Sequence, residues 1–148
     1  MKFELGVKDS RLQKWIDKVH QRVPKIMQFF MLEAYRQVTI STPVDTGRAR
    51  WGWNCSVGKE DFTIPAEGEY SLDAGRASKV FRVSELTKSN ADTLYICNAV
   101  PYIGHLNEGS SKQAPARFVE LAFTNAVNKL KIYVNGTQSS SQTGGLYR

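Results

Sequence analysis

The stretch TPVDTGRARWGWN (residues 42–54) gathers side chains of types that often take part in catalysis. Asp45, Thr46 and Gly47 reproduce the Asp-Thr-Gly triplet of aspartic proteases, whose active site needs two carboxylates that share one proton. This chain carries one copy of the triplet, and it follows a predicted helix and Pro43. We therefore expect the Asp45 side chain to cap a turn and Gly47 to supply a positive φ.

The rest of the chain offers no recognisable catalytic or cofactor motif. It lacks the phosphate-binding loop, the dinucleotide-binding glycine pattern, the zinc-protease motif and the nucleophile elbow. His20 and His105 stand alone, and together with Cys55 and Cys97 they lack the close spacing of zinc ligands. We expect reduced, buried cysteines, no metal, no cofactor and no enzymatic activity.

The two arginines of the opening stretch raise the possibility of nucleic-acid binding. Arg48 and Arg50 alternate with Trp51 and Trp53, so an extended chain would place arginines and tryptophans on opposite faces. This alternation favours a strand whose tryptophans enter the core, and it leaves solvent, phosphate or a neighbouring subunit's carboxylate as partners of the arginines. The net charge of +6 and the pI of about 9.4 permit a polyanionic partner. The other basic residues are scattered without a long run, which favours solvated surfaces.

The strongest structural signal is a series of apolar residues spaced three or four apart between residues 12 and 38, which predicts an amphipathic helix. Pro24 predicts either a kink or two helices, 10–22 and 24–40. The helix should stop at residues 41–43, because the residue before a proline disfavours helical geometry. A second apolar stripe, running from Pro115 to Tyr133, predicts a final helix that starts at the proline.

Alternating or apolar segments at residues 2–7, 51–55 and 92–100 predict strands, and residues 57–75 read as a loop or loose hairpin. Residues 101–109 predict one helical turn. We predict an α+β fold: a long N-terminal amphipathic helix, a small antiparallel sheet of about three to five strands, and a C-terminal helix packed on the sheet. A single domain should span residues 1–133, followed by a flexible or partner-docked tail, 134–148.

The N-terminus lacks the apolar region of a secretory signal, so we expect a protein made in the cytoplasm. The most apolar stretch, residues 26–35, is too short to cross a membrane and contains Gln28 and Glu33. The sequence therefore predicts no contact with a membrane.

Two segments together resemble the tail-completion proteins of tailed bacteriophages, the minor tail protein Z-like group at the head–tail joint. In that family a helix leads into a Pro-x-Asp-Thr-Gly-Arg turn, and later come Asn-x-x-Pro-Tyr, Leu-Glu-x-Gly and Ser-x-Gln-Ala-Pro elements. Residues 43–48, 98–102, 106–109 and 111–115 match these elements, except that Asn107 stands where the family usually has Glu. The resemblance covers roughly residues 8 to 133, counting the order of helices and strands.

The resemblance implies a structural virion protein of the neck: a subunit of a ring, commonly hexameric, that joins the tail to the connector complex and lets packaged DNA pass. A tail terminator or head-completion connector is a related alternative, and a small basic nucleic-acid-binding protein is a rival of another class. We expect contacts with neighbouring subunits or connector, terminator and tail-tube partners at Asp45, Arg48, Arg50, Tyr102, His105, Asn107, Glu108, Ser111, Lys112 and Gln113. Structural roles in turns and core are expected for Pro43, Gly47, Trp51, Trp53, Gly109 and Pro115.

Overall fold

The structure, a computed structural model, describes residues 10–68 and 93–142 and has the α+β architecture predicted from the sequence. Its elements are helix α1 (Ser10–Ser41), short helix α2 (Arg48–Trp51), strands β1 (Trp53–Val57) and β2 (Leu94–Asn98), helical turn α4 (Ile103–His105), π-helical turn η1 (Leu106–Ser110) and helix α5 (Phe118–Gln142). The predicted strand at 2–7 lies outside the described residues, as does the end of the predicted loop 57–75.

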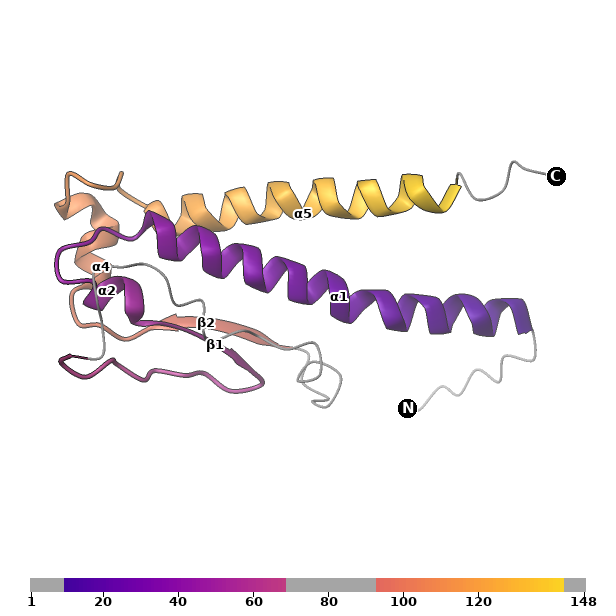
Figure 1. Cartoon of the computed structure of the whole chain (residues 1–148), viewed down its shortest axis with the longest axis horizontal. Coiled ribbons are helices and arrows are strands. Elements are labelled where there is room, and N and C mark those ends of the chain that lie inside the picture. The colour runs from indigo at the N-terminus through magenta and orange to yellow at the C-terminus, as the bar shows by residue number, and fades with distance from the viewer. Residues whose placement is uncertain (1–9, 69–92, 143–148) are drawn as a thin grey trace, which may run out of the picture.

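Helix α1 continues through Pro24, so the alternative of two separate helices is wrong. Proline removes one backbone hydrogen bond, but the apolar spacing continues on both sides of it and keeps both halves packed in one helix. Figure 1 shows α1 as a single helix whose axis bends near the middle of its length, the region in which Pro24 lies.

The described part of the chain contains a two-stranded antiparallel sheet, fewer strands than the three to five predicted. Its register pairs Trp53 with Asn98 and Val57 with Leu94. The described residues after β1 form an irregular loop rather than another strand, held by the buried Asn54, whose amide donates to the carbonyls of Asp61 (3.3 Å) and Thr63 (2.7 Å). The loop prediction is confirmed for these residues.

Helix α5 begins at Phe118, three residues later than predicted from Pro115. The reason is local: Arg117 has a φ of 63°, outside the right-handed helical region, so the helix cannot extend back through it. At its other end α5 continues to Gln142, beyond the predicted domain boundary at residue 133.

The core lies where the C-terminal half of α1, the sheet and the start of α5 meet. Val38, Trp53, Phe118 and Ala122 form one buried cluster, and Met31 is the centre of a second cluster against the sheet. Figure 1 shows α5 running along α1 on the side away from the sheet, with both helices extending past the strands.

The two cysteines lie on the paired strands as free thiols, as predicted, but both are half-buried rather than buried. Within the described residues, no helix is both long enough and apolar enough to span a bilayer.

Glu33 connects the two long helices by hydrogen bonds and ion pairs. Its carboxylate accepts from Arg36 (2.8 Å) and Gln37 (2.7 Å) of α1 and from Lys129 of α5 (2.8 Å). The Glu33 side chain is 13% exposed. The hydrogen bond from Arg36 is the main cause that lowers the pKa of Glu33 from 4.5 to about 2; the bonds from Lys129 and Gln37 also lower it, while burial opposes the shift.

Glu33→Gln is expected to lower the free energy of unfolding by about 2 kcal/mol near neutral pH. This is less than the pKa shift of Glu33 alone would imply, because Arg36 and Lys129 are half-exposed and solvent screens their charges. A lowered folded-state pKa stabilises the protein above pH 4.5, and this stabilisation is lost as the pH falls toward 2. Urea unfolding of both proteins across this range should show the difference shrinking with falling pH. A difference that stays constant would contradict this assignment.

Candidate functional site

The site begins where α1 ends, at the buried Thr42. The Thr42 hydroxyl donates to the carbonyl of Val38 (2.6 Å) and accepts from the indole nitrogen of Trp53 (2.8 Å). The Thr42 carbonyl accepts from the guanidinium of Arg50 (3.0 Å). Pro43 follows, and a proline excludes further helix at the residue before it. Thr42 thus fixes the direction in which the chain leaves α1, although the sequence analysis did not select it.

The Asp-Thr-Gly turn differs in one detail from the prediction. Gly47 has the expected positive φ of 91° and precedes the first residue of α2. The side chain that bonds to the turn is Thr46, whose hydroxyl accepts from the backbone N–H of Arg48 at 3.4 Å. Asp45 is exposed, with no side-chain hydrogen bond to the described residues, so the prediction that it caps the turn is wrong.

Arg48 to Trp51 form a helical turn, so the predicted strand at 51–55 begins only at Trp53. The proposed alternation of arginine and tryptophan faces is therefore wrong. Trp53 is buried as expected, but Trp51 is half-buried in α2. The turn is possible because Gly52 fits closely against Val100 and Asn98, where a side chain would collide.

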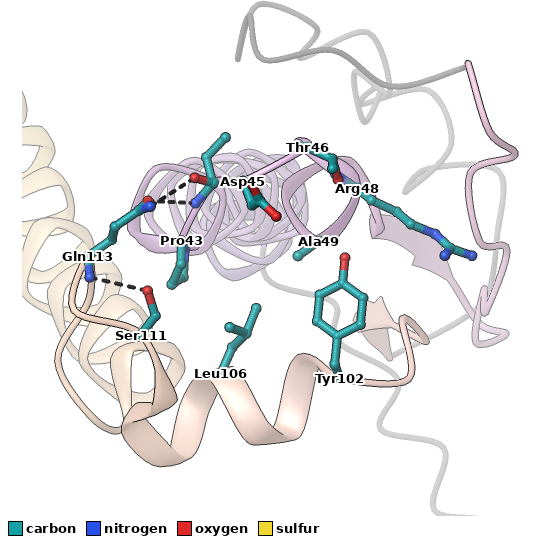
Figure 2. A pocket seen from close by; sticks show the side chains of 11 residues that line it. Pro43, Asp45, Thr46, Arg48, Ala49, Tyr102, Leu106, Ser111 and Gln113 are labelled. Carbon is teal, nitrogen blue, oxygen red and sulfur yellow. Dashed lines mark hydrogen bonds between the residues drawn. The ribbon is translucent and has the colours of Figure 1, made fainter.

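Arg50 has its partner within the chain, the Thr42 carbonyl, and burial lowers the pKa of its guanidinium. Nε atoms of Arg48 and Arg50 are buried without a hydrogen-bond partner among the described residues. Arg50 thus helps to hold the turn. The Arg48 side chain points away from the centre of the depression that Figure 2 shows and that is described below.

The second segment of interest leaves the sheet at Asn98. The Asn98 side chain donates to the carbonyl of Ala49 (2.8 Å) and accepts from the N–H of Val100 (3.0 Å), which ties the end of β2 to α2. α4 and η1 follow, and Gly109 ends the turn with a φ of 98°. The prediction of a helical turn over residues 101–109 is confirmed.

Asn107 caps the start of α5. Its side-chain oxygen accepts from the N–H of Val119 (3.0 Å), its amide donates to Glu120 (2.9 Å), and its carbonyl accepts from the N–H of Arg117 (2.6 Å). A glutamate at this position would have no donor for Glu120 and would add a like charge beside it. Asparagine therefore suits the local chemistry at position 107 better than glutamate would.

Gln113 joins the two segments. Its side-chain oxygen accepts from the backbone N–H of Val44 (2.9 Å), and its amide donates to the Val44 carbonyl (2.9 Å), across 69 residues of sequence. Its own N–H donates to the hydroxyl of Ser111 at 3.2 Å. Figure 2 shows the contacts of Gln113 with Val44 and with Ser111 at one edge of the depression.

The two segments together line a depression of about 470 Å³, hereafter the groove. In Figure 2 the Leu106 and Tyr102 side chains rise from one side, and Asp45 extends from the other. Of the residues predicted as partner contacts, the groove contains Asp45, Arg48, Tyr102, Ser111 and Gln113; it also includes Pro43, Val44, Thr46, Gly47, Ala49 and Leu106.

The remaining predicted contact residues lie outside the groove. Arg50 and Asn107 bond within the chain. His105 and Glu108 are exposed and lie 3.6 Å apart, and Lys112 is exposed. Of the predicted structural residues, Pro43 is buried and Pro115 is exposed just before α5.

The groove offers recognition groups: one exposed carboxylate, a phenol, and an apolar lining that includes Ala49 and Leu106. Within the described residues, His, Cys, Asp and Glu side chains form no group of three placed to hold a metal ion. Neither a family model, nor a curated protein, nor a solved structure matches the chain.

Gln113→Ala is expected to lower the free energy of unfolding by about 1–2 kcal/mol, because it removes two hydrogen bonds to Val44. Thermal or urea unfolding measures the loss. Lys112→Ala, at the exposed neighbouring position, is the matched control and should change stability by no more than about 0.5 kcal/mol. Equal effects of the two substitutions would mean that the bridge does not hold the segments together.

Proposed function

We propose that the chain is a tail-completion subunit in the neck of a tailed bacteriophage, where a ring of identical copies, most simply six, joins the tail to the connector complex and lets DNA pass. Its location would then be the virion, after assembly in the host cytoplasm. Related neck positions, tail terminator or head-completion connector, share this chemistry. The function is one of interface geometry and needs no catalytic group.

The observation that carries the proposal is the meeting of the two segments on which the resemblance depends. They lie far apart in sequence, yet the bridge from Gln113 to Val44 brings them to one groove. The main apolar cluster lies on α1, β1 and α5, and Ile103, Leu106 and Ala114 of the second segment pack against it, which holds that segment in place. A shared surface built from both segments is what a contact with a neighbouring subunit requires.

Some groove residues hold the groove together through hydrogen bonds within the chain, whereas others leave their side chains exposed to a partner. Gln113 and Ser111 have partners within the chain. Asp45 is exposed, and Tyr102 is 40% exposed at the groove wall. Tyrosine is enriched at the energetic centres of interfaces, because its ring buries a large area while its hydroxyl keeps a polar contact. We therefore assign Asp45 and Tyr102 as the main contacts with the neighbour.

A ring interface is heterologous: one face of each subunit meets a different face of the next, and rotation closes the ring. The groove supplies one such concave face. A neighbour that inserts a side chain beside Leu106 and donates a hydrogen bond or a positive charge to Asp45 would complement it.

Electron microscopy of lysates from a phage that lacks the gene for this chain tests the proposal. Filled heads and separate tails are expected, with joined particles restored when the wild-type gene is supplied from a plasmid. Normal, infectious particles in the absence of the chain would overturn the proposal.

A further inference from the structure

Five basic residues of α1 that look scattered in the sequence lie on one line of the helix. Arg11, Lys14, Lys18, Arg22 and Lys25 follow one another at spacings of three, four, four and three residues. At about 100° per residue, these positions fall within an arc of about 80° of the helix circumference. Such spacing makes a continuous stripe, hereafter the basic stripe, although no two of its members are adjacent in sequence.

Four of the five cations of the basic stripe are exposed and unpaired within the described part of the chain. Lys14, Lys18, Arg22 and Lys25 are exposed and form no ion pair with the described residues. The single acidic residue between positions 10 and 25, Asp17, lies about 60° around the helix from Lys14 and accepts a hydrogen bond from Gln13 (2.9 Å). The stripe therefore presents a concentrated positive charge to a partner outside the chain.

The basic stripe lies at the end of α1 remote from the groove. The contacts of α1 with α5 include Phe29 stacked on Tyr133 at 4.2 Å and Glu33 paired with Lys129. Both contacts lie on the C-terminal side of the stripe, and Figure 1 shows this half of α1 extending beyond the strands and diverging from α5. One molecule can thus use the groove and the stripe at the same time.

We propose that the basic stripe binds the phosphate backbone of duplex DNA. From Arg11 to Lys25 the stripe extends about 21 Å, with one cation per ~5 Å, at the rise of an α-helix. Each strand of a DNA duplex carries one phosphate per about 3.4 Å of axis, so several cations of a straight stripe can approach phosphates together. The inference goes beyond the proposed neck function and does not depend on it.

The position of the cations favours DNA over an anionic membrane. A helix that lies in a membrane interface carries basic residues across the polar face opposite its apolar side. In α1 the basic stripe borders only one edge of the apolar face. The other edge contains Gln13, Asp17 and His20, with no lysine or arginine. Because Trp15, 62% exposed, borders the stripe, anionic vesicles form the second arm of the test.

The test measures binding of the full-length chain to a fluorescent 20-base-pair duplex of arbitrary sequence by anisotropy, at several salt concentrations. Lys14→Gln/Lys18→Gln removes two stripe cations at exposed helical positions while keeping good helix formers. We expect the slope of log affinity against log salt to fall in magnitude by about 2, and affinity at low salt to drop at least ~10-fold. Lys14→Arg/Lys18→Arg should retain binding.

The matched control is Lys59→Gln/Lys112→Gln, which removes the same charge from an exposed position after β1 and an exposed position after η1, and it should leave the slope nearly unchanged. Circular dichroism verifies that each variant keeps its helix content. The inference is overturned if the wild-type chain does not bind the duplex at low salt, or if both double variants weaken binding equally. It is also overturned if vesicles containing phosphatidylserine bind the chain while DNA does not. None of these results bears on whether the chain joins heads to tails.

Discussion

Phe118→Ala is expected to lower the free energy of unfolding by about 3–5 kcal/mol, the usual cost of emptying a phenylalanine site in a core. Phe118 is 1% exposed and belongs to the cluster that contains Val38 of α1, Trp53 of β1 and Ala122 of α5. The substitution therefore removes contacts among three elements at once and leaves a cavity where they meet. Urea unfolding followed by circular dichroism measures the effect.

Leu121→Ala provides the matched control for this prediction. Leu121 follows Phe118 by three residues on the same helix, and its side chain is 49% exposed. Its truncation should cost no more than about 1 kcal/mol, because little contact is lost. Comparable losses at the two positions would show that α5 does not pack against α1 and the sheet as described.

Gly52→Ala is expected to cost about 1–3 kcal/mol through steric overlap alone. Gly52 has a φ of −70°, which any residue tolerates, so its backbone conformation does not explain the choice of glycine. A Cβ atom there would lie 2.6 Å from Val100 Cγ2 and 2.8 Å from Asn98 Oδ1. Val100 is 1% exposed, and Asn98 is held by Ala49, so neither can move easily. Thermal unfolding measures the loss.

Gly104→Ala is the control for the Gly52 substitution. A Cβ atom on Gly104 would meet nothing within 4 Å, and the residue lies in a helical turn where alanine is preferred over glycine. Stability should stay the same or rise. If Gly52→Ala were equally harmless, the close approach of α2 to the end of β2 would be incorrect.

The long elements were predictable from local pattern because many residues contribute to each. The apolar spacing between residues 12 and 38 extends over many turns, so one interruption at Pro24 does not change the outcome. The strand at 92–100 was also placed correctly, and only its ends were shortened. Short elements lack this redundancy. A four-residue helix such as α2 can replace an expected strand when tertiary contacts favour it.

Contacts that depend on distant parts of the chain could not be predicted from the sequence. Gln113 was selected as a residue that contacts a partner, but nothing in the local pattern shows that it bonds to Val44. The start of α5 was misplaced because the left-handed conformation of Arg117 is stabilised by its bond to the Asn107 carbonyl. The sequence contained the groove's residues, but only the fold shows that they meet.

The basic stripe shows the converse case, in which the information was present locally but was not used. The five cations form no run of consecutive charges, since other residues separate them in the sequence. The spacing becomes informative only after helical geometry is applied to it. Charge patterns in long predicted helices are therefore best examined by helical position.

The most direct test of the central claim is rescue of the gene-deficient phage by plasmid-borne variants, scored by counting joined particles in micrographs. Asp45→Ala/Tyr102→Ala removes the groove's exposed carboxylate and phenol ring; Glu67→Ala/Phe62→Ala removes an exposed carboxylate and an exposed aromatic ring from a loop elsewhere. We predict that the groove variant, folded as stably as wild type, leaves heads and tails unjoined, while the loop variant restores joined particles. Full rescue by the stably folded groove variant would contradict the account.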